Sequence, residues 1–125
     1  MSGARFSGLV VFCSDTEKSA AFYEGLLGFT RAATYEDIEL TMPVGDAATA
    51  SMLLHHGADP TGHYLGIFEV DDVDATVEQI RAAGYEILRE PVDEPWGVRM
   101  AGVGAPDGYS LDLVTPAPSD PATAQ

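Results

Sequence analysis

The sequence contains two segments that closely resemble each other. Residues 9–29 read LVVFCSDTEKSAAFYEGLLGF, and residues 65–85 read LGIFEVDDVDATVEQIRAAGY. In each segment an apolar run leads into an acidic turn, an amphipathic helix pattern, and a glycine followed by an aromatic residue. An internal repeat of this kind predicts one small structural unit that is used twice, with a ligand site between the copies.

Both copies carry signals for where a helix begins and ends. Asp15 in the first copy, and Asp71 or Asp72 in the second, are placed to accept a hydrogen bond from the free amides of a first helical turn. Gly28 and Gly84 are placed as the left-handed residues that end a helix. Asp15 and Asp72 are 57 positions apart but Gly28 and Gly84 are 56 apart, which predicts a second helix one residue shorter than the first.

The remainder of each half reads as three strands. Apolar alternation between turn-forming residues predicts strands at 30–35, 38–42, 50–55, 86–88, 98–103 and 110–114. Residues 91–95 read as an acidic, proline-bearing loop, and residues 56–62 as a polar loop between the halves. We therefore predict an α+β fold, with two tandem βαβββ modules at about residues 5–55 and 63–115 in a single domain spanning 1–115. Residues 116–125 lack apolar anchors and are expected to form a flexible tail.

Composition excludes several classes of partner. Twenty acidic residues against six basic ones give a formal net charge of −14. This charge argues against binding to nucleic acid or an anionic membrane, because phosphate recognition needs clustered Lys and Arg. The single cysteine, Cys13, excludes an internal disulfide. The sequence has neither an apolar run near the ~20 residues that span a bilayer nor an export signal, so we expect a cytoplasmic protein.

Four motifs together resemble a known family. They are SDTEKSAAFYEGLLGF at 14–29, FEVDDVDA at 68–75, WGVR at 96–99 and DGYSLDLV at 107–114. In this order and spacing they resemble the vicinal oxygen chelate superfamily, which groups glyoxalase I, extradiol dioxygenases, fosfomycin-resistance enzymes and bleomycin-type resistance proteins. The resemblance implies paired βαβββ modules, each curling a mixed sheet around a cavity, in a homodimer.

Catalytic members of that superfamily hold a divalent metal with four side chains. The resemblance carries those four positions onto Gly8, Ser51, Leu65 and Asp112. Only Asp112 is a good ligand, and one carboxylate does not make a metal site. We therefore expect no metal and no other cofactor. The alternative is a relocated divalent-metal site formed by His55, His63 and Asp112.

Strand alternation predicts which side chains face the cavity. It places Val10 on that side, together with these candidate ligand-binding residues: Phe12, Ser51, Leu53, His55, Ile67, Glu69 and Asp112. The other candidate ligand-binding residues are Tyr35, Trp96 and Arg99. Glu69 and Asp112 would attract a cation or act as an acid–base pair, unless Arg99 neutralises them. Trp96, the only tryptophan, would stack on a planar ligand or anchor its own strand.

These observations favour a protein that binds a small, partly aromatic molecule without a metal. The two carboxylates favour a ligand that carries a positive charge. This is the bleomycin-resistance type of action, and it is not enzymatic. The alternative is a lyase or oxygenase of glyoxalase or dioxygenase type that uses a relocated metal or the Glu69–Asp112 pair. A regulatory ligand sensor is a third possibility.

Overall fold

A computed structural model describes residues 6–57 and 63–116 of the chain. The chain divides into two compact units, Met1–Gly62 and His63–Gln125, and each is described by itself. Most of the predicted loop at 56–62 and nearly all of the predicted tail lie outside the described residues.

The first unit is one helix and a four-stranded sheet. Its elements in chain order are β1 (Gly8–Cys13), α1 (Thr16–Gly25), β2 (Thr30–Thr34), β3 (Ile38–Val44) and β4 (Ala48–His56). In the sheet, which we name the first sheet, the strand order is β1-β4-β3-β2. β1 pairs with β4 in parallel, and the other neighbours are antiparallel.

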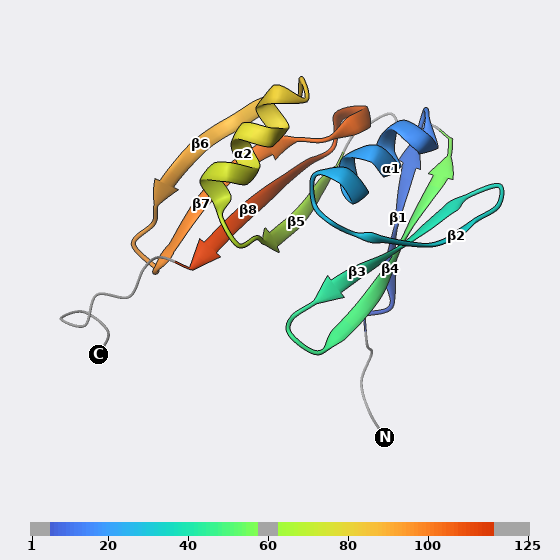
Figure 1. Cartoon of the computed structure of the whole chain (residues 1–125), viewed down its shortest axis with the longest axis horizontal. Coiled ribbons are helices and arrows are strands. Elements are labelled where there is room, and N and C mark those ends of the chain that lie inside the picture. The colour runs from blue at the N-terminus through green and yellow to red at the C-terminus, as the bar shows by residue number, and fades with distance from the viewer. Residues whose placement is uncertain (1–5, 58–62, 117–125) are drawn as a thin grey trace. The chain divides into compact units, whose positions relative to one another are not determined.

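The second unit repeats this arrangement (Figure 1). Its elements are β5 (Tyr64–Glu69), α2 (Val73–Ala82), β6 (Ile87–Asp93), β7 (Val98–Gly104), a short 3-10 turn at Pro106–Gly108, and β8 (Ser110–Pro116). The strand order of this second sheet is β5-β8-β7-β6, with β5 parallel to β8. The prediction of an α+β fold with βαβββ used twice is thereby confirmed.

The two helices begin in the same way. The side chain of Asp15 accepts a hydrogen bond from the amide of Lys18, and that of Asp72 from the amide of Ala75, each at 3.1 Å. Gly28 and Gly84 have the positive φ angles expected after a helix end, 76° and 94°. The predicted difference in helix length is wrong, because α1 and α2 both have 10 residues. The extra residue of the first copy falls in the turn between the helix and its glycine.

Each helix covers one face of its own sheet, and the core of each unit lies between that helix and that sheet. In the first unit the fully buried side chains that alternate along the strands include Val11, Cys13, Leu40, Met52 and Leu54. The opposite face of each sheet is turned away from that sheet's helix, and we name it the helix-free face. No described helix is both long and apolar enough to cross a membrane.

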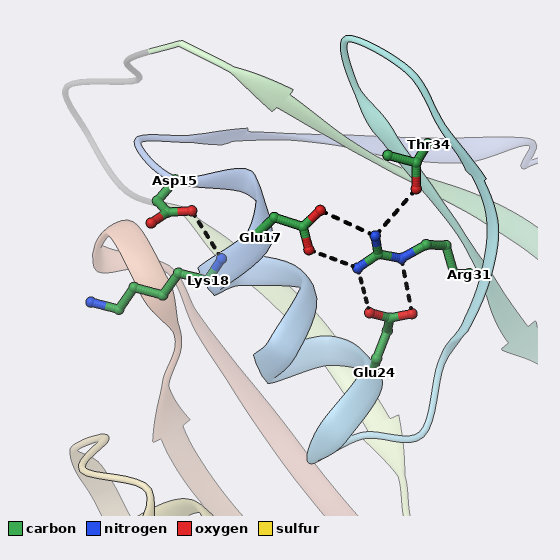
Figure 2. Close-up of polar contacts among 6 residues, drawn as sticks. All are labelled: Asp15, Glu17, Lys18, Glu24, Arg31 and Thr34. Carbon is green, nitrogen blue, oxygen red and sulfur yellow. Dashed lines mark hydrogen bonds and ion pairs between the residues drawn. The ribbon is translucent and has the colours of Figure 1, made fainter.

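A guanidinium clamp fixes β2 against α1 (Figure 2). Arg31 of β2 donates to both oxygens of Glu24, at 2.7 and 3.2 Å, and to both oxygens of Glu17, at 3.1 and 3.2 Å. It also donates to the hydroxyl of Thr34 at 3.2 Å. Paired fork-to-fork hydrogen bonds of this kind fix orientation as well as distance.

β6 extends further than the sequence pattern predicts. Pro91 and Val92 lie within the strand rather than in the expected loop at 91–95. A proline is tolerated here because β6 is the edge strand of the second sheet, where an amide that faces outward has no strand partner. The pairing with β7 is irregular between Arg89 and Val92, around this proline.

Candidate functional site

The helix-free face of the second sheet carries a row of four residues, one from each strand. In the register of the sheet, Ile67 of β5 lies beside Asp112 of β8, Asp112 beside Gly102 of β7, and Gly102 beside Arg89 of β6. Glu69 lies two residues beyond Ile67 on the same face, beside Val114. Ile67, Glu69 and Asp112 therefore share one face, which is where strand alternation predicts them.

A bulge in β5 adds Tyr64 to this group. Tyr64 pairs with Ser110 and Ile67 with Asp112, so β5 contains one residue more than β8 over this stretch. Gly66 lies within the bulge with a φ of 124°, a conformation that L side chains rarely adopt. Bulges re-aim side chains, and here the phenol of Tyr64 donates to Oδ2 of Asp112 at 2.6 Å.

The Tyr64–Asp112 hydrogen bond has an electrostatic consequence. The Asp112 carboxylate accepts the hydrogen bond from the phenol and raises the pKa of Tyr64 to about 12, with a smaller contribution from burial. Tyr64 is therefore a neutral donor near neutral pH. The carboxylate keeps its other oxygen, Oδ1, for a further donor.

Gly102 leaves room for the charged side chains on either side of it. A Cβ atom at this position would lie 3.3 Å from Oδ1 of Asp112 and 3.6 Å from the Cβ atom of Arg89. The guanidinium of Arg89 pairs with Glu94 at 3.0 Å, and the Glu94 side chain is only 12% exposed. Asp112 and Arg89 are therefore held by different partners, with the backbone of Gly102 between them.

The helix-free face of the first sheet has a different character. Val10 and Phe12 of β1 lie beside Leu53 and His55 of β4, respectively. Nδ1 of His55 lies 2.9 Å from Oδ1 of Asp37, and its ring meets the ring of Phe12 edge to face at a centroid distance of 5.7 Å.

A second polar pair lies further along this face. Ser51 donates to Oε2 of Glu39 at 3.0 Å. In the register of the first sheet, Ser51 lies beside Gly8 and Glu39 beside Leu53. The first sheet therefore combines apolar side chains with two hydrogen-bonded polar pairs.

Three of the predicted ligand-binding residues lie apart from these groups. Arg99 binds Asp74 of α2, at 2.8 and 3.0 Å, and Asp93 of β6 at 3.1 Å, on the side of the sheet that α2 covers. It therefore does not neutralise Asp112, and we do not carry it into the site. Trp96 lies in the turn between β6 and β7 and is 66% exposed, and Tyr35 lies in the turn between β2 and β3 and is 59% exposed.

Sequence reasoning missed Tyr64, Asp37 and Glu39. Regular alternation counted back from Ile67 places Tyr64 on the opposite face, and only Gly66 in the middle of an apolar strand pointed to an irregularity. Asp37 lies in the turn before β3 and Glu39 lies within β3, and they meet His55 and Ser51, respectively, only through the pairing of β3 with β4.

A family model described as the Glyoxalase/Bleomycin resistance protein/Dioxygenase superfamily matches residues 5–113. The chain belongs to this superfamily. It is 29% identical over 114 residues to "Lactoylglutathione lyase" of Haemophilus influenzae, a match that covers 80% of this chain and 84% of that protein. It is 31% identical over 102 residues to "Putative glyoxylase CFP32" of Mycobacterium bovis, but this match spans 78% of this chain and only 39% of that longer protein.

Solved structures of other proteins share the fold of this chain. A superfamily member from Sphaerobacter thermophilus DSM 20745 matches with a TM-score of 0.71 and 23% identity, over 90% of this chain and 97% of the other. TnmS3, an antibiotic binding protein from Streptomyces sp. CB03234, matches with a TM-score of 0.69 and 26% identity, over 94% of this chain and 99% of the other.

In catalytic members of the superfamily, four positions hold a divalent metal. The residues at those positions of this chain do not form a site that fits a metal ion. At Gly8 even a Cβ atom would lie 2.5 Å from the carbonyl oxygen of Ser51, so no ligating side chain fits without a backbone shift. Leu65 has no donor atom, Ser51 is engaged by Glu39, and Asp112 by Tyr64. We derive no chemistry through a metal at these positions.

The alternative set of His55, His63 and Asp112 gains no support from the contacts of its members. His55 binds Asp37 and Asp112 binds Tyr64. The ring of His63 lies 6.2 Å from that of Tyr109. Within residues 6–57 and 63–116, no three His, Cys, Asp or Glu side chains are grouped to hold a metal ion.

Proposed function

We propose that this protein binds a small, partly aromatic, positively charged molecule on the helix-free face of its second sheet, without a metal. The observation that carries the proposal is the Asp112 carboxylate. It is held in place by Tyr64, lies against Gly102, and is the one good ligand among the superfamily's four metal positions. It serves better as an anchor for a cationic donor than as part of a chelate.

The surroundings of Asp112 support a ligand of this chemistry. Ile67 and Tyr64 expose 60% and 57% of their surface, which offers apolar contact beside the carboxylate. Glu69 adds a second negative charge on the same face, while Arg89 is paired with Glu94. A charge-assisted hydrogen bond contributes about 1.5–3 kcal/mol, and apolar burial supplies the rest of the affinity.

The likeness to TnmS3 supports a binding role, because that protein is an antibiotic binding protein and resembles this chain over nearly its whole length. Planar cationic antibiotics are therefore the first ligands to test. Trp96 is the only tryptophan in the chain, so its fluorescence reports binding without interference from other tryptophans.

A second candidate is a lyase or oxygenase of glyoxalase or dioxygenase type. It is favoured by the relative named lactoylglutathione lyase and by the shared face of Glu69 and Asp112. Two carboxylates on one face can divide acid and base roles when their pKa values differ. In this chain they would have to act without the usual metal ligands or with relocated ones.

Elemental analysis and ligand titration distinguish the two candidates. The binding proposal predicts far less than one equivalent of divalent metal in the purified protein, and a saturable change of Trp96 fluorescence with planar cationic antibiotics. Stoichiometric metal that is lost on replacing His55, His63 or Asp112 with Ala would favour the enzyme and overturn the proposal.

A further inference from the structure

Among the residues that the structure describes, Arg89 is the one arginine of the second unit that lies on the same face as Asp112. Arg81 and Arg99 bind acids on the side of α2. Arg89 lies two strands from Asp112 in the register of the second sheet, with Gly102 between them. It is therefore the described arginine best placed to neutralise Asp112, and the proposed function depends on its not doing so.

The gap between Arg89 and Asp112 is small enough for an arginine side chain to cross. A Cβ atom at Gly102 would lie 3.3 Å from Oδ1 of Asp112 and 3.6 Å from Cβ of Arg89, so those two atoms are no further apart than the sum of these distances. An extended arginine spans such a gap, and Gly102 has no side chain to block it. The charge of Arg89 already acts on this group, because Asp112 raises the pKa of Tyr64 and Arg89 opposes that effect more weakly.

Glu94 competes with Asp112 for the guanidinium of Arg89. Nη2 of Arg89 lies 3.0 Å from Oε2 of Glu94, and this oxygen is buried in a side chain that is only 12% exposed. A buried carboxylate is costly unless it is paired, whereas Asp112 already accepts the hydrogen bond from Tyr64. Arg89 therefore pairs with Glu94, the acid that needs it more.

The backbone of Glu94 is fixed by the turn between β6 and β7. Its amide donates to the carbonyl of Val98 at 2.7 Å, and its carbonyl accepts from the amide of Gly97 at 3.1 Å. Gly97 has a φ of 94°, the left-handed conformation that suits a glycine in a tight turn. Glu94 is thus a fixed point that holds the flexible side chain of Arg89.

We propose that Glu94 is a positioning residue that keeps Arg89 away from Asp112 and so sets the preference of the site for cations. When Glu94 cannot hold it, the guanidinium of Arg89 crosses Gly102 and pairs with Oδ1 of Asp112, where it takes the place of a cationic ligand. The choice of a cationic ligand rests on the proposed function, whereas the movement of Arg89 concerns the protein alone.

Two planar probes of similar shape measure this preference: 9-aminoacridine, which is a cation near neutral pH, and acridine, which is neutral there. Both are titrated at low salt and followed by nuclear magnetic resonance. We expect the wild-type protein to bind the cation more tightly by roughly tenfold or more, the value of one charge-assisted hydrogen bond. In Glu94→Gln the preference should fall to about threefold or less, because a neutral amide competes poorly with Asp112 for a guanidinium.

Removing Arg89 as well should restore the preference for the cation. In the double variant of Arg89→Gln and Glu94→Gln no guanidinium can reach Asp112, so the preference should return to the wild-type value or above. Glu90→Gln is the matched control: it removes the same charge from the same strand, but Glu90 pairs with Arg81 at 2.6 Å, and the preference should not change. An equal loss in Glu90→Gln, or a loss that the double variant does not restore, would overturn the proposal.

Chemical denaturation of the free protein tests the movement of Arg89 without a ligand. In the wild-type background the effects of Arg89→Gln and Asp112→Asn on the free energy of unfolding should add, since the two side chains have different partners. In the Glu94→Gln background they should not add, because the two charges then pair.

The two measurements separate this proposal from the proposed function. Additive effects in both backgrounds, or a full preference for 9-aminoacridine in Glu94→Gln, overturn the role of Glu94 and leave the proposed function standing. Coupling that appears only in Glu94→Gln supports that role. If the wild type then shows no preference for the cation, the proposed function fails while the hold of Glu94 on Arg89 stands.

Discussion

Among single residues, Gly66 has the largest effect on the candidate site. Its positive φ makes the bulge in β5 possible, and the bulge turns Tyr64 to the face that carries Asp112. Without the bulge, regular alternation places Tyr64 on the side covered by α2. One backbone conformation therefore decides whether the carboxylate is held by a neutral phenol or stands alone.

Replacing Gly66 with Ala should destabilise the protein by roughly 1–3 kcal/mol, because an L residue is strained at its φ of 124°. Chemical denaturation measures the change. Gly25→Ala is the matched control, since Gly25 ends α1, has no neighbouring atom within 4 Å of an added Cβ and does not have a positive φ. Equal effects of the two substitutions would show that the bulge is not strained in this way.

Replacing Asp112 with Asn should lower the pKa of Tyr64 from about 12 toward the ordinary value of about 10. The carboxylate is the main cause of the raised value, and Asn removes its charge at nearly constant shape. The phenolate absorbance of the folded protein, with Tyr64→Phe to identify the transition, measures the shift.

The same pKa gives the sign of the dependence of stability on pH. The folded-state value lies above the unfolded one, so the contribution of this hydrogen bond is complete below about pH 10 and is lost as pH rises through about 12. Asp112→Asn should therefore cost stability at neutral pH. A Tyr64 pKa that is unchanged in Asp112→Asn would contradict the hydrogen bond itself.

Strand alternation predicts the faces of several site residues but not their partners. Val10, Phe12, Leu53 and His55 share one face, as do Ile67 and Asp112, because regular pairing preserves a period of two. The contacts that set their chemistry come from residues distant in sequence, such as Asp37 for His55. These depend on turn geometry and on a bulge, which a period of two cannot reveal.

At the scale of elements, an ion pair joins the helix to the strand that follows it in each unit, but the positions of the cation and the acid are exchanged between the units. In the first unit a strand cation, Arg31, meets the helix acid Glu24. In the second unit a helix cation, Arg81, meets the strand acid Glu90 at 2.6 Å. Glu24 and Arg81 occupy equivalent positions in the repeat, 57 residues apart like Asp15 and Asp72. The repeat therefore preserves the contact while reversing its sign.

Exchanging the charges in the first unit tests this equivalence. Arg31→Glu alone should lower the melting temperature, because it places a third acid beside Glu17 and Glu24. Adding Glu24→Arg should recover part of the loss, as in the reversed order of the second unit. Thermal denaturation at low and high salt measures both effects, which should shrink as salt screens the charges. No recovery in the double variant would show that the clamp requires its specific fork geometry.

At the scale of the whole molecule, the repeat alone predicts the topology. Helix caps, glycines and apolar alternation recur in both halves, and both fold as βαβββ with the same strand order. Boundaries are predicted less well where tertiary pairing overrides local signals, as in β6, where edge position admits Pro91. The relation of each sheet to a cavity stays a prediction from family resemblance.

We expect a homodimer in solution. Each sheet has edge strands, and several large apolar side chains outside the proposed ligand site are exposed, among them Val44, Leu88 and Val92. Exposed sheet edges and apolar side chains of this kind are commonly covered by a second copy. Sedimentation equilibrium at micromolar concentration should give twice the chain mass of 13.2 kDa, and a monomer would contradict the expectation.

The central claim is that the protein binds a cationic aromatic molecule through Asp112 without a metal. The most direct test is a Trp96 fluorescence titration with a planar cationic antibiotic, before and after treatment of the protein with a chelator. The account predicts the same saturable binding in both, weakened roughly tenfold or more in Asp112→Asn at low salt. Binding that disappears on chelation and returns with one equivalent of divalent metal would contradict it.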